Sequence, residues 1–295
     1  MLAHDLDAWL ADVAQRQKPA TVDFYRRRAL WIRHTFGKRD WSDLTAPLVL
    51  QAIDQANRWP NNLQKAPDTC RGNIIAWDQF QKWALDTGRL SEPVTTKKIK
   101  KPAGRLREVL PSPEDIRRIL AAASPAFAAI YQALLFTGAR PGELCRATIA
   151  DFDRKRRVIS LKEHKTAGKT HRPRLIPISE PCLEILTAAI AGNKTGPIFR
   201  RKDGEGWTVP HLSASFRRLR KSCLVDRRVV LYSTRHNLAT ELCRAKGIHA
   251  AAAVLGHKGL QTIQRYVHPG AKDLVDYIDA LNAPPEDPQA PPKAA

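Results

Sequence analysis

Residues 93–111 are the segment that most limits how this chain can fold. They follow neither the periodicity of a helix nor the alternation of a strand, and they are rich in Lys and Arg, with Glu108 as the one acid. A segment of this composition is typical of an extended, basic linker. We therefore predict a first domain at 1–92, a second at 112–282 and a disordered, Pro-rich tail at 283–295.

The first domain carries apolar side chains at helical spacing, and prolines and glycines interrupt the pattern between the runs. We predict four or five helices joined by short turns, with 48–59 and 68–87 among them. Thr21 is the expected N-cap of a helix that ends near Phe36. The domain is therefore predicted to be an all-α bundle.

The second domain combines helices with a short sheet. Ser112 precedes Pro113 and two acids, which is typical of the start of a helix. Two short runs rich in branched residues, 158–161 and 174–178, predict antiparallel strands. The later predicted helices are 128–137, 180–191, 212–222, 235–246, 249–255, 260–267 and 271–281. The predicted fold class is therefore mainly α with a small antiparallel β-sheet.

The formal net charge of the chain is +20 at pH 7. Such an excess of like charge repels itself in a compact state, and nucleic acid is the usual partner that neutralises it. The side chains that we expect to contact DNA are Arg26, Arg27, Lys97, Lys98, Lys100, Lys101, Arg217, Arg218, Arg220 and Lys221. For the helix with Arg26 and Arg27, a solvated face is an equal alternative. For 212–221, contact with the DNA backbone is favoured over reading of bases.

Composition also bears on the compartment. No apolar run approaches the roughly 20 residues of a membrane span, and the first residues carry acids where a signal peptide has bases. The five cysteines are widely spaced and include no Cys-x-x-Cys, which argues against a disulfide framework and a zinc site. We expect a soluble, cytoplasmic protein with no membrane partner.

Motifs for metals and nucleotides are incomplete. AGKT at 167–170 matches the end of a phosphate-binding loop, but Glu163 stands where that loop requires glycine. Gly204 and Gly206 lack the third glycine of a dinucleotide fingerprint, and we find no His-Glu-x-x-His. We therefore expect no cofactor and no metal ion.

A set of side chains outside those motifs suits attack on a phosphodiester without a metal: Arg140, Lys165, Arg235, His257 and Tyr266. Two guanidiniums can clamp the non-bridging oxygens as negative charge develops there. A lysine can protonate the departing oxygen, and a tyrosinate can act as nucleophile. A phosphotyrosine ester would conserve the energy of the cleaved bond, so religation would need no ATP. Each residue alone also has a structural explanation, such as a helix-end salt bridge.

The order and spacing of these residues resemble the tyrosine recombinases, the phage-integrase family, over about residues 110–270. TGARPGEL at 137–144 resembles the family's first box, and RHNLAT at 235–240 resembles its second. Residues 165–178 resemble the β-hairpin that carries a catalytic lysine, and LGH at 255–257 precedes a tyrosine at the family's spacing.

The resemblance implies a role for each residue. By resemblance Arg140 and Arg235 are the two catalytic arginines, Lys165 the catalytic lysine, His257 the donor to the phosphate and Tyr266 the nucleophile. Glu143 is implied as a supporting acid. The resemblance further implies an all-α core-binding (SAM-like) domain followed by an α+β catalytic domain. Such a pair would cleave one strand of double-stranded DNA through a 3′-phosphotyrosine intermediate. It would then religate the strand to a partner strand, within a tetrameric assembly.

One position departs from the family pattern, and two pairings stay open. Tyr232 stands where the family usually has histidine, three residues before Arg235. His236 is adjacent to Arg235, but on a helix it points about 100° away. Lys169 is a rival to Lys165 as general acid. The expected function is integration or excision of a mobile element. The alternatives are a type IB topoisomerase-like relaxing enzyme and a DNA-binding protein that has lost catalysis.

Overall fold

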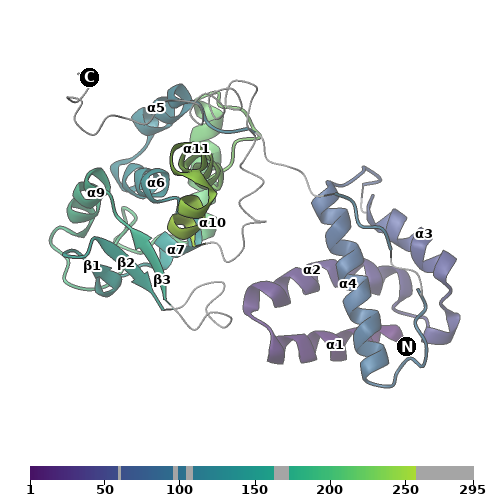
Figure 1. Cartoon of the computed structure of the whole chain (residues 1–295). Helices are drawn as coiled ribbons and strands as arrows, with labels where there is room; N and C mark the ends of the chain where they lie inside the picture. The colour runs from purple at the N-terminus through teal and green to yellow at the C-terminus, as the bar shows by residue number, and fades with distance from the viewer. Residues whose placement is uncertain (59–60, 96–98, 104–108, 163–172, 257–295) are drawn as a thin grey trace, which may run out of the picture. The chain divides into compact units, whose positions relative to one another are not determined.

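The computed structural model describes residues 1–58, 61–95, 99–103, 109–162 and 173–256 (Figure 1). The chain divides into two compact units, Met1–Leu106 and Arg107–Ala295, called here the N-terminal and C-terminal units. The finer boundaries predicted for the linker stay a prediction. The predicted helices 260–267 and 271–281, and the tail 283–295, lie outside the described residues.

Every regular element described in the N-terminal unit is a helix. The elements are α1 (Leu2–Arg16), α2 (Pro19–Phe36), the 3-10 turn η1 (Trp41–Asp43), α3 (Ala46–Ala56) and α4 (Pro67–Asp86). The predicted cap at Thr21 is wrong, because α2 begins at Pro19 with Lys18 as its N-cap. Proline favours the first helical position, where its fixed φ suits the helix and its missing N–H removes no bond.

Aromatic side chains fill the core of the N-terminal unit around α4, which contacts α1, α2 and α3. Trp77 and Phe80 are fully buried on α4. The ring of Phe80 lies 5.3 Å from that of Trp9 and 5.0 Å from that of Trp41, measured between centroids. Burying each such side chain stabilises the fold by roughly 1.5–3 kcal/mol, so the aromatic face of α4 holds this unit together.

Part of the predicted linker is attached to α4. The backbone N–H of Thr95 donates to Oε1 of Gln81 at 2.9 Å, and Nε1 of Trp77 donates to Oγ1 of Thr95 at 3.3 Å. Lys101 forms an ion pair with Asp78 at 2.5 Å. The segment thus packs on the N-terminal unit at these residues, and its extended conformation stays a prediction. Val94 and Ile99 also pack against the core of this unit. The sequence pattern missed the attachment because two isolated apolar residues and a few polar contacts form no readable periodicity.

Most of the described residues of the C-terminal unit lie in helices. These are α5 (Pro113–Ala122), α6 (Pro125–Thr137), α7 (Pro141–Arg146), the 3-10 turn η2 (Ile149–Asp151), α9 (Glu180–Ile190), α10 (Val209–Ser222) and α11 (Ser233–Leu255). The predicted start of α5 is confirmed, because Oγ of Ser112 accepts from the N–H of Asp115 at 3.1 Å. Within the described part of the chain, no helix is both long and apolar enough to cross a bilayer.

A three-stranded antiparallel sheet lies beside these helices, in the order β1-β2-β3 (Figure 1). The strands are β1 (Phe152–Asp153), β2 (Val158–Leu161) and β3 (Arg174–Pro177). Leu161 pairs with Arg174 and Ile159 with Ile176, and all four side chains are buried. The predicted fold class is thus confirmed. The two-residue β1 was not predicted, because so short a strand has no readable alternation.

α6 is the central helix of the C-terminal unit, with α9 and α11 packed against it (Figure 1). Ile130, Tyr131 and Leu134 of α6 are fully buried in the main core. α6 ends at Gly138, whose φ of 57° is left-handed. A Cβ at Gly138 would lie 2.7 Å from Leu255 and 2.8 Å from Leu238. Close packing of α11 on this turn therefore requires glycine.

α11 folds back on itself at Gly247. A straight helix would place residues 235 and 255 about 30 Å apart, yet Nη2 of Arg235 donates to the carbonyl of Leu255 at 2.7 Å. Gly247 has φ 79° and ψ 171°, a conformation that breaks the helix. Ala239 of the first half and Ala251 of the second pack in one small core. The predicted division of this region into two helices is thus correct.

Gly247→Ala should destabilise the C-terminal unit by about 1–3 kcal/mol, because the backbone region that Gly247 occupies is nearly forbidden to residues with a Cβ. Urea unfolding followed by circular dichroism measures the loss. Lys246→Ala, at the exposed neighbouring position, is the control and should change stability by no more than about 0.5 kcal/mol. Equal midpoints for the two variants would contradict the role given to the break.

Candidate functional site

Arg140 and Glu143 form the first part of the candidate site, in the turn between α6 and α7. Arg140 is the N-cap residue of α7, and Pro141 begins the helix. The carboxylate of Glu143 accepts from the backbone N–H of Arg140 at 2.9 Å and from its Nη1 at 2.7 Å. The Glu143 side chain is buried, whereas that of Arg140 is 25% exposed. Glu143 thus fixes the guanidinium of Arg140 through Nη1, while part of the Arg140 side chain still reaches the surface.

Arg235 joins this turn to both ends of α11. Its Nη1 donates to the carbonyl of Gly138 at 2.7 Å, and its Nη2 donates to the carbonyl of Leu255 at 2.7 Å. Its side chain is fully buried. The predicted pair Arg140 and Arg235 therefore belongs to one cluster, because Gly138 lies two residues before Arg140. These two bonds fix the orientation of the Arg235 guanidinium.

Arg174, at the start of β3, is a member of the cluster that the sequence analysis did not select. Its Nε lies 4.0 Å from Oε2 of Glu143. Its Nη1 donates to the carbonyl of Leu175 at 2.6 Å and its Nη2 to that of Val254 at 2.8 Å. The available signal was alternation: Arg174 shares the face of β3 with Ile176, which pattern reasoning assigns to the core.

The end of α11 is capped by arginines. The last carbonyls of a helix have no partner within the helix and carry its negative dipole end. Val254 and Leu255 present two such carbonyls, and Arg174 and Arg235 donate to them. Gly256 then ends the helix with a left-handed φ of 65°. The cluster and the C-terminus of α11 therefore stabilise each other.

The electrostatics of the cluster depend on Glu143. Burial alone would raise the pKa of Glu143, but hydrogen bonds from Arg140 and the charges of Arg140 and Arg174 hold it below its ordinary value. Burial lowers the pKa of Arg174 to about 10, and Glu143 opposes this while Arg235 and Arg140 add to it. Arg174 is therefore still charged at neutral pH, and the cluster carries more positive than negative charge.

Tyr232 lies at the N-cap position of α11, three residues before Arg235. Its ring meets that of His236 edge to face, with centroids 5.1 Å apart and an interplanar angle of 72°. His236 is buried and Tyr232 is half-buried. Tyr232, at the position where histidine was expected, therefore has a histidine ring beside it. The expectation that His236 points away from Arg235 stays a prediction.

The structure brings together Arg140, Glu143 and Arg235 among the predicted catalytic residues, with Tyr232 in the turn before Arg235. The other predicted residues of the site lie outside the described residues: Lys165, its rival Lys169, His257 and Tyr266. Their roles stay predictions. Within the described ranges, no three His, Cys, Asp or Glu side chains gather so as to hold a metal ion.

The residues predicted to contact DNA differ in what their side chains do. Those that are exposed are Arg26, Arg27, Lys100, Arg217, Arg218 and Lys221. Arg220 instead donates to the carbonyls of Arg227 at 2.6 Å and Val229 at 2.8 Å, and so holds the loop after α10. Lys101 is paired with Asp78. Lys97 and Lys98 lie outside the described residues. DNA contact by any of these residues stays a prediction.

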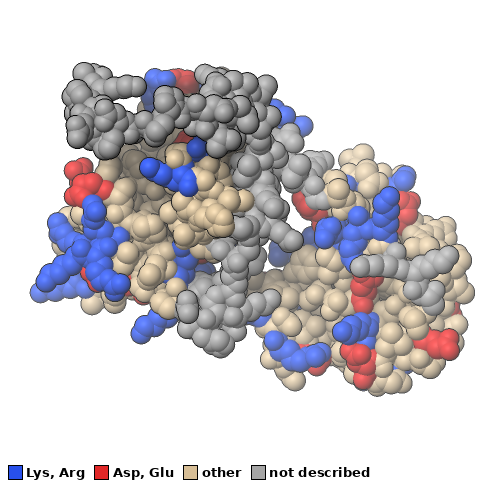
Figure 2. Space-filling view, in the orientation of Figure 1, with Lys and Arg blue, Asp and Glu red and all other residues tan. Residues whose placement is uncertain are grey.

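Figure 2 shows a further group of Lys and Arg side chains over the β1–β2 end of the C-terminal unit. The exposed residues of the turn between these strands are Arg154, Lys155, Arg156 and Arg157. Arg157 is paired with Glu180 of α9. This turn lies at the opposite end of β2 from the residues that lead to Lys165. It is therefore a basic surface separate from the cluster.

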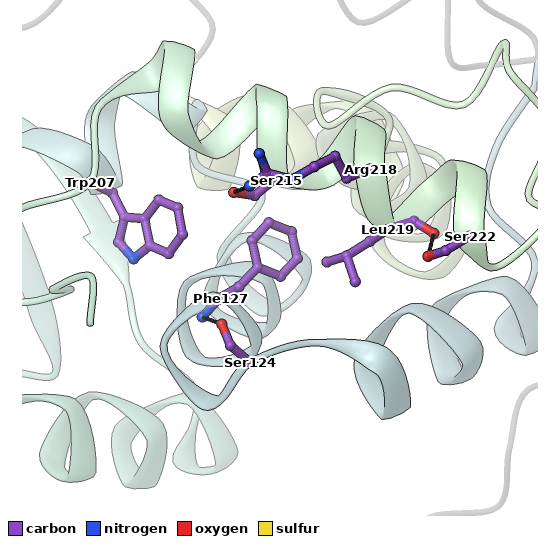
Figure 3. Close-up of a pocket in the computed structure, with 7 residues that line it drawn as sticks. All are labelled: Ser124, Phe127, Trp207, Ser215, Arg218, Leu219 and Ser222. Carbon is purple, nitrogen blue, oxygen red and sulfur yellow. Dashed lines mark hydrogen bonds between the residues drawn. The ribbon is translucent and has the colours of Figure 1, made fainter. Parts of the chain in front are cut away.

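A cavity of about 280 Å³ lies between the first turn of α6 and α10. Figure 3 shows the rings of Phe127 and Trp207 together with Leu219 on its apolar wall. Arg218, which was predicted to contact DNA, also lines it. Among the described residues of the predicted site, Arg140, Glu143, Tyr232 and Arg235 do not line this cavity.

The family model of the phage integrase family matches residues 111–272, which is more than half of the chain. The chain therefore belongs to the phage integrase family, and the predicted resemblance is confirmed. The match includes both boxes that carry Arg140 and Arg235, together with residues 257–272.

Curated relatives are tyrosine recombinases named XerC. The protein from Myxococcus xanthus is 26% identical over 166 residues, which cover 52% of this chain and 54% of that protein. The chain thus spans about half the length of this relative. The protein from Actinobacillus pleuropneumoniae serotype 7 is 24% identical over 285 residues, covering 89% of this chain and 87% of that protein.

Solved structures share the fold at low sequence identity. A lambda integrase dimer bound to a COC' core site superposes with a TM-score of 0.74 at 15% identity, covering 90% of this chain and 76% of that chain. The Tn1549 transposon integrase in complex with transposon right end DNA gives a TM-score of 0.73 at 16% identity, covering 95% of this chain and 99% of that chain. These likenesses establish the fold.

Glu143→Gln should cost about 2–4 kcal/mol of unfolding free energy at neutral pH, because it leaves buried cations without their counter-charge. The pKa of Glu143 is lower in the folded chain than in the unfolded one. Its ionised form therefore stabilises the fold above the ordinary glutamate pKa, and this contribution is lost as the pH falls through the folded pKa. Denaturant unfolding at about pH 7 and about pH 4 should show the difference between wild type and variant narrowing with acid.

The control for that comparison is Glu114→Gln, which removes an exposed partner of Arg117 on α5. An exposed pair contributes about 0–1 kcal/mol, so this variant should follow the wild type at both pH values. A cost for Glu143→Gln that is the same at both pH values would show that the ionised carboxylate is not what stabilises the cluster.

Proposed function

We propose that this protein is a site-specific tyrosine recombinase, which cleaves one strand of double-stranded DNA and joins it to a partner strand. The observation that carries the proposal is the cluster in which Arg140 and Arg235 are held by one buried network through Glu143 and Gly138. In the proposed complex these two guanidiniums clamp the non-bridging oxygens of one phosphate, which enters beside the partly exposed side chain of Arg140 because Arg235 is buried in the protein alone. Membership in the phage integrase family supports the same assignment.

The proposed step exchanges one phosphodiester for another. The phenolic oxygen of Tyr266 attacks the phosphorus, the bond to the 5′ oxygen breaks, and a 3′-phosphotyrosine ester forms. Lys165 gives a proton to the departing 5′ oxygen, and His257 donates to the phosphate. Religation reverses the same exchange with a new 5′ hydroxyl. The number of phosphoester bonds is unchanged, so the cycle needs no ATP.

Tyr232 stands at the position that we assign to acceptance of the nucleophile's proton, and the ring of His236 lies against it. A neutral phenol is a poor proton acceptor, whereas a neutral imidazole is suited to the task. The edge-to-face contact of the two rings supports a shared role for the pair. Lys169 is the alternative to Lys165 as general acid.

The proposed partner is double-stranded DNA, bound by four protomers that exchange strands through a Holliday junction. The net charge of +20 supports a polyanionic partner. A lambda integrase tetramer bound to a Holliday junction shares this fold, with a TM-score of 0.74 at 16% identity. Similar folds in phage and transposon integrases support integration or excision of a mobile element as the proposed context.

Tyr266→Phe should keep the DNA affinity of the wild type and form no covalent adduct, because the variant lacks only the attacking oxygen. A nicked DNA substrate that traps the intermediate, followed by denaturing electrophoresis and mapping of the cleaved position, measures the adduct. Tyr131→Phe is the matched control, since Tyr131 of α6 is buried in the core of the C-terminal unit, and it should form the adduct like the wild type. An adduct that persists in Tyr266→Phe would move the nucleophile to another tyrosine.

Relaxation of DNA without a preferred site would favour a topoisomerase, and DNA binding without cleavage by the wild type would favour a protein that has lost catalysis.

DNA affinity should fall steeply with salt. A protein that neutralises 6–10 phosphates loses about 10³–10⁵-fold in affinity between 50 and 200 mM salt. Fluorescence anisotropy of labelled DNA measures the slope of log affinity against log salt. Arg217→Ala, at an exposed position on α10, should reduce the slope by about one. Arg117→Ala, whose charge is paired with Glu114, is the control and should leave the slope unchanged. A slope near zero for the wild type would remove the argument from charge.

A further inference from the structure

Arg174 is a buried cation that the proposed reaction does not use. Its side chain is 6% exposed and lies on the core-facing side of β3. Removing a guanidinium from water costs several kcal/mol, and an apolar side chain of similar volume often fills such a space at lower cost. A cation kept in this place therefore calls for a specific reason.

The contacts of Arg174 close a ring of interactions. Glu143 holds Arg140 on one side and lies 4.0 Å from Nε of Arg174 on the other. Arg174 then donates to Val254, and the next carbonyl, of Leu255, accepts from Arg235. Arg235 returns to Gly138, two residues before Arg140. The ring thus contains Arg140, Glu143, Arg174, Val254, Leu255, Arg235 and Gly138.

We propose that Arg174 is a positioning residue for DNA strand cleavage, which sets the relative placement of Arg140 and Arg235 through Glu143 and the end of α11. The inference rests on the proposed recombinase function. Arg174 touches no reacting atom in this assignment. It acts through the carboxylate that holds Arg140 and through the carbonyl next to the one that holds Arg235.

Gly256 supplies a second observation for the same role. A Cβ at Gly256 would lie 2.7 Å from Nη1 of Arg174 and 2.9 Å from its Cδ and Cζ. The guanidinium of Arg174 therefore lies directly against the backbone where α11 ends, and His257 is the next residue in the sequence. Arg174 thereby also fixes the point from which the chain continues towards His257.

The choice of arginine over lysine follows from the geometry. One planar guanidinium donates to the carbonyls of Leu175 and Val254 at once and keeps its Nε side toward Glu143. The compact ammonium of lysine carries the charge but lacks this rigid fork. Arg174→Lys should therefore preserve the counter-charge to Glu143 and lose part of the positioning.

The test is single-turnover cleavage of nicked DNA at saturating protein, with DNA affinity measured separately. Arg174→Ala should keep its affinity within about threefold and cleave at least about a hundredfold more slowly, the penalty typical of a displacement of about 1 Å in an active site. Arg174→Lys should cleave at an intermediate rate. Guanidinium ion, added well below denaturing concentrations, should restore part of the Arg174→Ala rate by entering the vacated space.

Arg200 offers a matched control in the same unit. Its guanidinium also donates to two backbone carbonyls, those of Thr195 at 2.6 Å and Gly204 at 3.2 Å. Arg200→Ala should therefore lose comparable thermal stability yet cleave at the wild-type rate, with no effect of guanidinium ion. Equal rates for Arg174→Ala and wild type would overturn the inference. So would a loss of cleavage in both arginine variants that simply follows their loss of thermal stability.

A variant at Gly256 carries the test if Arg174→Ala does not fold. Gly256→Ala should slow cleavage by displacing the Arg174 guanidinium. Gly88→Ala has a similar left-handed φ of 69° with nothing within 4 Å of the added Cβ, so it should cleave like the wild type. Equal rates for these two variants would overturn the inference. A wild type that forms no adduct would instead overturn the proposed function, and the two failures are thereby distinguished.

Discussion

The buried carboxylate of Glu143 is the group on which the candidate site depends. Three guanidiniums, those of Arg140, Arg174 and Arg235, lie in one cluster, and their mutual repulsion would be severe in a buried volume of low dielectric constant. Glu143 accepts from Arg140 and faces Arg174, which accounts for its lowered pKa despite burial. Segments distant in the sequence can therefore meet here because one anion lies between Arg140 and Arg174.

The backbone contributes the rest of the balance. The turn after α6 and the end of α11 both present carbonyls, and Arg235 donates to one from each. Both places end in glycine with left-handed φ, at Gly138 and Gly256. A third glycine, Gly247, turns α11 back so that its last turn reaches its first. These glycines allow backbone carbonyl oxygens, which carry no titratable charge, to accept hydrogen bonds from the Arg235 guanidinium.

Sequence reasoning recovered what local chemistry determines, and missed what depends on the partner across space. The helix start at Ser112 and Pro113 and the two longer strands follow from local patterns, and they were predicted, whereas the start of α6 at Pro125 was placed three residues too late. The arginine of each box was selected through the family resemblance. Arg174 was given no role in the site, and Arg220 was predicted to contact DNA. Both predictions follow from the rule that a charged residue is taken as exposed unless a partner is known. Their partners are carbonyls 80 and 9 residues away in the sequence. The alternation of Arg174 with Ile176 was the one local clue.

The charge of the cluster bears on what it can bind. Glu143 offsets one of the three positive charges of Arg140, Arg174 and Arg235, so a net charge of two remains. Burying such uncompensated charge is costly. Selection for stability alone would favour equal numbers of positive and negative side chains, or apolar side chains in place of the charged ones. An anionic ligand would neutralise the remaining positive charge, and that charge would then contribute to binding. For a phosphate, the attraction becomes stronger as negative charge builds on its oxygens during cleavage. The side chain of Arg140, 25% exposed while Glu143 and Arg174 are buried, is the member of the cluster through which such an anion would be met.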